Sequence, residues 1–416
     1  MSLVLNTNIA SLQAQNNLTT SSSQLSTATE DLSSGLKINS AADNAAGYAI
    51  VQKFQTQVSG LSQASQNATD AINLSQTAGS ALSQITSNLQ SIRDLAVQAA
   101  NGTYQASDRA AINTTVNQYL QQINTIANQT SFNGINVLNG SSSSLSFQVG
   151  ANVGQAIDVQ LGQGATTGQL GQVSEISTGD ISGAFLNASG ASGATLSLSG
   201  LSITGADGTS YTFTGGTAQS AQDVVNAINS AGVDGVSAAV NASGGINIYS
   251  SGELAVNGAS VTGASAASAA SGGFANLTSG ALAFGASGVG ASASGLAATG
   301  AAYTAGNVIT ASGSLAGGDV LTVDDANQLI SRVDAALTQV STYSSTFGAV
   351  QDRFQSDIST LSAQQTNLTS SQSSIQDTDF AAETATLSQA QVLQQAGISV
   401  LATANSLPQN ILKLLQ

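Results

Sequence analysis

Hydrophobic residues near the C-terminal end recur every seven positions, in two interleaved lines. The steps of three and four between the lines place both on one face of a helix, as in a coiled-coil seam. The first line holds mostly small residues and the second large ones: Ala390, Gly397, Ala404 and Ile411, then Leu393, Val400, Leu407 and Leu414. Such a seam allows a partner helix to approach closely. The pattern alone leaves open whether that partner belongs to the same chain or to another molecule.

Pro408 lies inside this pattern. Proline has no backbone N–H and its ring crowds the preceding turn. We therefore expect a kink or a helix end near residue 408.

The N-terminal stretch shows a weaker helical pattern. Residues 3–33 carry apolar side chains at helical spacing among Gln, Asn, Ser and Thr: Leu5, Ile9, Leu12, Leu18, Leu25 and Leu32. Ser and Thr are mediocre helix formers, so this helix needs a partner to bury its apolar stripe. Gly35 interrupts the pattern, and Asp43 is the predicted N-cap of the next helix.

Two long heptad patterns lie between the ends of the chain. Residues 47–100 carry two apolar lines, through Phe54, Leu61, Ala68, Ser75, Leu82, Leu89 and Ala96, and through Ile50, Ala64, Ala71, Ala78, Ile85, Ile92 and Ala99. Residues 322–375 carry another, through Val333, Val340, Phe347, Phe354, Leu361, Leu368 and Ile375. Each helix would be roughly 70–75 Å long. These lengths predict a bundle or rod rather than a globule.

Shorter elements follow the first long helix. Asn101-Gly102 ends that helix, and a second helix is expected with Ile112, Val116, Tyr119, Ile123 and Ile126 on its buried face. The period then falls to two, which predicts a β-hairpin near 145–161. Residues 166–321 are rich in Gly, Ala, Ser and Thr and contain scattered alternating runs and one expected short helix at 218–232. Disorder is the alternative for this insert, above all at 258–300.

The predicted fold class is therefore multi-domain, with a mainly α core and a central insert that is α+β or mainly β. Residues 1–33 and 384–416 are expected to pair as terminal helices, joined through connectors at 34–46 and 376–383. Residues 47–165 and 322–375 are expected to form a helical rod that includes the hairpin. The insert at 166–321 is expected to lie on the outer surface.

Composition excludes several classes of function. The sequence has no Cys and no His, so thiolate sites and Ser–His–Asp or Cys–His catalysis are excluded, and an enzyme is not expected. A net charge of −15, with Lys and Arg totalling 7, argues against nucleic-acid binding. No apolar run is long enough to span a membrane, and the first residues do not resemble a signal peptide. Nothing in the pattern suggests a cofactor or a metal.

Several segments at both ends resemble the bacterial flagellins, the subunits of the flagellar filament. They occur in the family's order and cover about 1–165 and 322–416. The segments are NTNIASLQAQNNL (6–18), LSSGLKINSAADNAAG (32–47), GLSQASQNATDAINLSQTAGSAL (60–82), LQSIRDLAVQAANGT (89–103), FNGINVLNG (132–140), FQVGAN (147–152), GAVQDRF (348–354) and AQVLQQAGISVLATANSLPQNILKLLQ (390–416). Within the insert, residues 220–251 are similar to a small motif of flagellin and hook-protein insertions.

This resemblance implies a non-enzymatic subunit that assembles head-to-tail into an extracellular filament for swimming. It implies export through the flagellar type III apparatus without a cleaved signal peptide. The implied partners are other copies of the chain, an export chaperone, the filament cap and the hook–filament junction proteins. Inter-subunit packing would involve the large and small seam residues together with the N-terminal stripe: Leu393, Gly397, Val400, Ala404, Leu407, Ile411, Leu414, Leu5, Ile9 and Leu12. A hook–filament junction protein is the alternative, because it has similar ends.

Residues 89–98 also resemble the segment that a flagellin-sensing Toll-like receptor of vertebrates detects. The matching positions are Ile92, Arg93, Leu95 and Gln98. Strongly recognised members carry a basic residue where this chain has Ser91, and an acidic residue where it has Thr115. The resemblance therefore implies weakened receptor activation. The alternative is that Arg93 and Asp94 simply lie on a solvated or subunit-facing surface.

Two further hypotheses concern the insert. Its Ser and Thr residues are candidates for O-glycans, as in some flagellins. An adhesin or binding module would also have to reside there, but no aromatic patch or pocket motif is evident. A zinc-protease insert needs paired His residues and is excluded by the absence of His.

Overall fold

The computed structural model describes residues 8–162, 164–177, 181, 185, 195–242, 244–257, 259–262, 281–282, 292–293 and 314–414. For 257, 259–262, 281–282, 292–293 and 407–414 only the backbone is described. The helices are α1 (Ile9–Ser34), α2 (Ala45–Ala100), α3 (Ala106–Gln129), α4 (Ala221–Ser230), the 3₁₀ turn η3 (Leu315–Gly317), α5 (Val323–Gln376) and α6 (Phe380–Leu414). The chain is thus mainly helical with a strand-rich insert, which confirms the predicted fold class.

The chain divides into two compact units. One comprises Met1–Thr69, Gln148–Ile157 and Gln355–Gln416, and the other Asp70–Phe147 and Asp158–Phe354. Helices α2 and α5 contribute to both. The layered domain organisation expected from the sequence stays a prediction.

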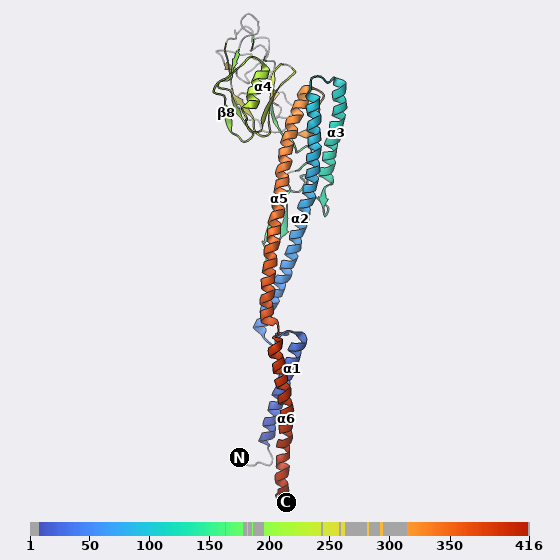
Figure 1. Cartoon of the computed structure of the whole chain (residues 1–416), viewed down its shortest axis with the longest axis vertical. Coiled ribbons are helices and arrows are strands. Elements are labelled where there is room, and N and C mark those ends of the chain that lie inside the picture. Colours follow the sequence, from blue (N-terminus) through green and yellow to red (C-terminus); the bar gives the residue numbers. More distant parts are fainter. Residues whose placement is uncertain are drawn as a thin grey trace. The chain divides into compact units, whose positions relative to one another are not determined.

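In the first unit, α1 and α6 pack side by side in antiparallel orientation (Figure 1). The segments that join them to α2 and α5 also pair: the N–H of Lys37 donates to the carbonyl of Gln376 at 2.6 Å, and that of Thr378 to Gly35 at 3.0 Å. Gly35 ends α1 in the left-handed region, with φ of 74°. This conformation suits glycine, which has no Cβ.

The start of α2 differs from the prediction for Asp43. The N-cap is Asn44, whose side chain accepts from the N–H of Gly47 at 2.9 Å. The Asp43 carboxylate instead accepts from the N–H groups of Ser40 and Asn39, at 2.8 and 3.0 Å, and these bonds lower its pKa. Asp43 therefore stabilises the connector, not the helix end.

The heptad lines of α2 and α5 are the ones that the structure buries. In α2, both predicted lines are buried from Leu61 to Ala99, whereas Ile50 near the start is exposed. In α5, the line from Val333 to Leu361 is buried. In the first unit, Leu61 and Ala64 of α2 pack against Leu361 of α5. The heptad pattern thus predicted the contact face of both helices correctly.

Helix α3 follows α2 after a short turn, and its Arg109 donates back to the Ala99 carbonyl at 2.8 Å. Its fully buried face differs slightly from the predicted one and consists of Val116, Leu120, Ile123 and Ala127. Two strand pairs come next: β1 (Ser131–Phe132) with β2 (Ile135–Asn136), and β3 (Ser144–Gln148) with β4 (Ala156–Gln160). The second pair confirms the hairpin expected near 145–161.

The insert is built from short strands around α4. Its sheets have the strand orders β10-β11-β5-β15, β12-β7-β8 and β14-β13-β6-β9. The strands are β5 (Ser174–Ser177), β6 (Thr195–Ser197), β7 (Ser202–Thr204), β8 (Ser210–Thr212), β9 (Thr217–Ala218), β10 (Val236–Val240), β11 (Ile246–Ser250), β12 (Ala255–Asn257), β13 (Ala259–Thr262), β14 (Ala281–Leu282) and β15 (Ser292–Ala293). Val224, Val225 and Ile228 of α4 join the apolar core of the insert. The expected short helix is confirmed, whereas most of 258–300 lies outside the described residues.

Helix α5 has two faces in the second unit. One face is apolar and buried: Ala326, Leu329, Val333, Ala336 and Val340. The other contacts the insert through polar groups at positions 324, 328 and 331, one helical stripe. Asp324 accepts from the N–H of Ala242 at 2.9 Å, Gln328 donates to Glu175, and the Ser331 and Ser237 hydroxyls lie 3.0 Å apart.

Candidate assembly surface

The α1–α6 interface is built from small side chains. Ala14, Ser21 and Ala28 of α1 are buried at seven-residue spacing, and Ala390 and Ala404 of α6 are buried two such steps apart. Gly397 lies between the two alanines, and a Cβ placed there would be 3.3 Å from Cδ1 of Leu18. The line of Ala and Gly predicted on α6 therefore packs against α1 of the same chain.

Polar side chains of α1 add hydrogen bonds across this interface. The Ser21 hydroxyl, which is buried, donates to the Ala390 carbonyl at 3.0 Å. Near the other end of the pair, the Ser11 hydroxyl donates to Oδ1 of Asn405 at 2.7 Å. Because neither contact involves a charge, the pairing depends on close packing and neutral hydrogen bonds.

The second predicted line of α6 faces away from α1. Leu393 and Val400 are 46% and 57% exposed, and their neighbours Val392 and Ile398 are also exposed. On α1, Ile9 and Leu12 are 63% and 49% exposed. Large apolar side chains of this helix pair are therefore exposed on its surface instead of being buried within the pair.

The structure places the two predicted lines of α6 differently, and it reveals residues that sequence analysis missed. Leu387, Gln394 and Leu401 are half-buried and complete the side of α6 that carries Ala390. Their seven-residue spacing was detectable, but the polar Gln394 concealed it. Leu5 lies outside the described residues, and the side chains of Leu407, Ile411 and Leu414 are not described, although their backbone belongs to α6.

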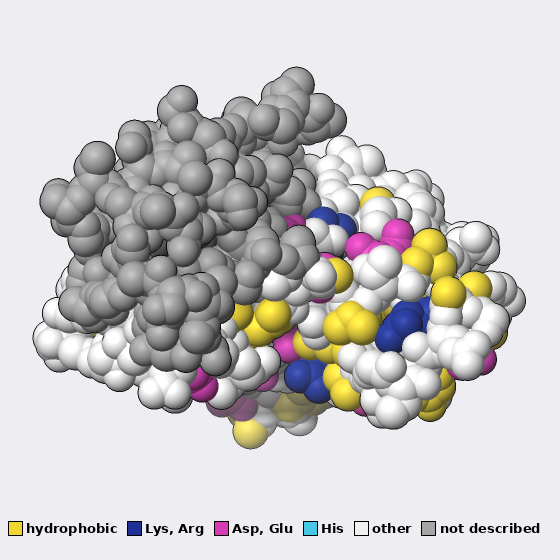
Figure 2. All heavy atoms as spheres, turned by 90° about the horizontal axis from the view of Figure 1, so that it is seen from above, with side chains coloured by type: hydrophobic (Ala, Val, Ile, Leu, Met, Phe, Trp, Pro, Cys, Tyr) yellow, Lys and Arg dark blue, Asp and Glu magenta, His cyan; other side chains and the backbone are white. Residues whose placement is uncertain are grey.

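Charged side chains are scarce on this surface. Residues 8–29 and 384–406 contain no Asp, Glu, Lys or Arg. Where charges begin, burial and the nearby carboxylates of Glu383, Asp43 and Glu30 raise the pKa of Asp31. Figure 2 views the molecule from above and so does not show this surface; on the face that it shows, the few basic side chains lie singly, with acidic and apolar side chains near them.

The part of the chain that the structure describes holds no group of acidic side chains arranged to bind a metal ion. Among the described helices, none is both long and apolar enough to cross a membrane.

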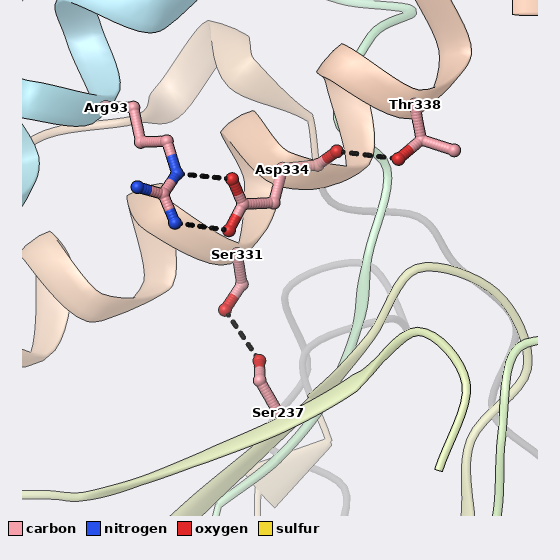
Figure 3. A network of polar contacts seen from close by, with 5 residues as sticks. All are labelled: Arg93, Ser237, Ser331, Asp334 and Thr338. Atoms are coloured by element: carbon pink, nitrogen blue, oxygen red, sulfur yellow. Dashed lines mark hydrogen bonds and ion pairs between the residues drawn. The ribbon is translucent and has the colours of Figure 1, made fainter. Parts of the chain in front are cut away.

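The segment that resembles the receptor-detected one lies on α2 in the second unit. Ile92 is fully buried, Leu95 is half-buried, and Gln98 is exposed and donates to the Tyr104 hydroxyl at 2.8 Å. Arg93 binds Asp334 of α5 with both arms of its guanidinium: Nε lies 2.6 Å from Oδ1, and Nη2 lies 3.3 Å from Oδ2. These bonds raise the pKa of Arg93. Figure 3 shows this pair beside the Ser331–Ser237 contact with the insert.

Paired terminal helices with an exposed apolar line, a heptad-packed helical core and a separate insert define a class: a self-assembling structural subunit. Family models for the bacterial flagellin N-terminal helical region and C-terminal helical region match residues 5–143 and 330–415. The chain belongs to the bacterial flagellin family.

Individual relatives agree along the whole chain. A flagellin of Salmonella typhimurium is 35% identical over 499 aligned positions, and the B-type flagellin of Pseudomonas aeruginosa is 36% identical over 490; each alignment covers 100% of both chains. The solved structure of FliC from Burkholderia pseudomallei covers 68% of this chain and 99% of its own, at 24% identity and a TM-score of 0.37. The full-length flagellin matches support a structural subunit of the flagellar filament over a junction protein.

Proposed function

We propose that the exposed apolar side chains of α1 and α6 form the contacts between neighbouring subunits in the filament. The observation that carries this proposal is the exposure of four large apolar side chains, Ile9, Leu12, Leu393 and Val400. The small residues of the same two helices already pack α1 against α6. Gly397 and Ala404 then act within the subunit, by drawing α1 and α6 together. Leu407 and Leu414 continue the seven-residue spacing of Leu393 and Val400 and are assigned to the same contacts, with Leu5. Ile411 continues the line of Gly397 and Ala404, and its role in subunit packing stays a prediction. The role is structural, and the chain catalyses no reaction.

The assembly proposal is tested by removing residues 1–33 and 384–416. We expect electron microscopy to show long filaments from the intact chain after seeding or salting out, and none from the trimmed chain. Circular dichroism of the trimmed chain should still report its helices, because α2, α3 and α5 keep their heptad contacts. Equal polymerisation of both proteins would contradict the assignment. Short rings or caps from the intact chain would favour the junction protein.

The layered arrangement follows from this assignment. We place α1 and α6 in the inner part of the filament, α2, α3, α5 and the β3–β4 hairpin in the next layer, and the insert outside. The insert supports an outer position because its buried cluster draws on residues 176–256 and so does not depend on the terminal helices. Labelling of intact filaments with a bulky amine- or thiol-directed probe at engineered insert sites tests this. Protection of every insert site would refute it.

Family membership also supports the proposed route and partners. The chain leaves the cell through the flagellar type III apparatus, and a chaperone holds its C-terminal segment before export. In the filament it meets the cap and the hook–filament junction proteins. A pull-down from a flagellated host tests the chaperone contact. A chain without residues 384–416 should lose chaperone binding, whereas unchanged binding would place the chaperone site elsewhere.

Activation of a flagellin-sensing Toll-like receptor is proposed to be weak. Ser91 and Thr115 offer no charges for recognition, and Arg93 is already paired with Asp334. We expect a receptor reporter assay to require a higher dose of this protein than of a flagellin with a basic residue at the Ser91 position. Replacing Ser91 by Arg should lower that dose. Full potency of the unmodified protein would contradict the proposal.

A further inference from the structure

The carbonyl of Ala404 has lost its normal partner within α6. In an α-helix each carbonyl accepts from the N–H four residues later. For Ala404 that residue is Pro408, which has no N–H, and α6 nevertheless continues to Leu414. Of the kink or helix end expected near Pro408, the helix end is therefore wrong, and the kink stays a prediction. Because the helix continues through Pro408, the Ala404 carbonyl one turn earlier lacks a helical donor.

Asn8 supplies the missing donor from α1. Its side-chain Nδ2 lies 2.9 Å from the Ala404 carbonyl oxygen. Ala404 is only 6% exposed, so water has limited access to this site. A buried carbonyl without a donor is destabilising, and the bond from Asn8 removes that cost.

The same Asn8 amide acts on α1. Its Oδ1 accepts from the N–H of Ser11 at 3.1 Å and so caps the first turn of that helix. The amide is held at both ends, which fixes its orientation. The adjacent bond between Ser11 and Asn405 lies at the same level of the pair.

We propose that Asn8 and Pro408 form a register lock for the α1–α6 pair, that is, a contact that fixes how the two helices are aligned along their length. A carbonyl inside α6 normally accepts from its own helical N–H and can take a second bond, as that of Ala390 does from Ser21. Proline creates a carbonyl inside the helix that has no helical donor at all. The chain has a single Pro, so only one carbonyl loses its helical donor in this way. Sliding α1 by one turn would leave the Ala404 carbonyl without a donor, and Asn8 would gain only a second bond to a carbonyl that already has its helical donor. Asn8 is thus a positioning residue for the terminal pair. Its relevance to filament growth rests on the proposed function.

A double-mutant cycle tests the lock. Asn8→Ser keeps a good N-cap but has a side chain too short to reach Ala404. Pro408→Ala restores the helical N–H to the Ala404 carbonyl. We expect Asn8→Ser to raise the critical concentration for assembly of the full chain about tenfold when Pro408 is present. In the Pro408→Ala background the same substitution should have almost no effect.

A second readout does not require assembly. The chain has no Cys, so the substitutions Ser11→Cys and Asn405→Cys place a unique thiol pair at a described contact. Its disulfide equilibrium against glutathione measures how often α1 and α6 meet in this register. We expect Asn8→Ser to lower that equilibrium constant about tenfold with Pro408 present and to leave it unchanged with Pro408→Ala.

The outcomes separate the lock from the assembly proposal. Loss of cross-linking that depends on Pro408 supports the lock, even if no variant forms filaments. An equal effect of Asn8→Ser in both backgrounds would mean that Asn8 does not act through the freed carbonyl, and the lock would be wrong. No effect in either background would overturn it as well.

Discussion

Replacing Leu393 with Asp should abolish filament formation and leave the subunit folded. Leu393 is 46% exposed and faces away from α1, so the subunit itself tolerates a charge there. At a subunit contact the same carboxylate would be buried without a partner, at a cost of about 3 kcal/mol or more. Such a cost raises the critical concentration roughly 150-fold. Sedimentation of polymer across a concentration series measures this change.

Leu321 offers a matched control for this substitution. It is also 46% exposed, but it precedes α5 and lies outside the terminal pair. Leu321→Asp makes the same chemical change and should leave the critical concentration nearly unchanged. If the two variants assemble equally well, Leu393 does not lie in a subunit contact. Helical circular dichroism of both variants should match that of the unmodified chain.

Replacing Phe354 with Ala should destabilise the helical core by about 3–5 kcal/mol. Phe354 of α5 is fully buried, and its ring meets that of Phe147 edge-to-face, with centroids 5.8 Å apart and an angle of 79° between the planes. The substitution leaves a cavity and also removes this aromatic contact. Denaturant unfolding followed by circular dichroism measures the loss.

Phe380→Ala is the control for the aromatic core. Phe380 begins α6 and is 60% exposed, so its truncation should change the free energy of unfolding by less than about 0.5 kcal/mol. Phe354→Ala should in addition speed amide exchange in β3, because Phe147 belongs to that strand. If Phe354→Ala lowers the free energy of unfolding no more than Phe380→Ala does, the ring pair does not stabilise the core.

The long helices were predictable because their heptad lines are nearly complete. From Leu61 to Ala99 only Ser75 interrupts the apolar lines of α2, and its hydroxyl bonds to the Ala71 carbonyl of the preceding turn at 2.8 Å. The polar interruption therefore needs no partner from another helix. Where the line is weaker, as at Ile50, the predicted burial is not observed.

Periodicity could not predict which apolar line of α6 packs against α1 and which one is exposed. The lines through Ala390 and Leu393 are only three positions apart, so both fit one broad apolar face. Which line meets α1 depends on how closely the helices approach, and that is set by Gly397 against Leu18. The Asn8–Ala404 bond was equally hidden, because it joins residues 396 positions apart.

The insert was predictable only in outline. Short alternating runs indicated strands, and the amphipathic segment at 218–232 indicated α4. The strand order was not accessible, because β5 pairs with β11 across some seventy residues and nothing local fixes that partner. The polar contacts between the insert and α5 could not be predicted either. In the sequence, Asp324, Gln328 and Ser331 look like the solvent-exposed face of an ordinary helix.

The uncharged character of the terminal pair has a thermodynamic consequence. Contacts made by neutral, mostly apolar side chains release ordered water and lower the heat capacity of the system on association. Cooling weakens such contacts, sulfate strengthens them, and simple salts at moderate ionic strength do little, because there are few charges to screen. The length of the filament should therefore follow temperature much more closely than it follows the salinity of the surroundings.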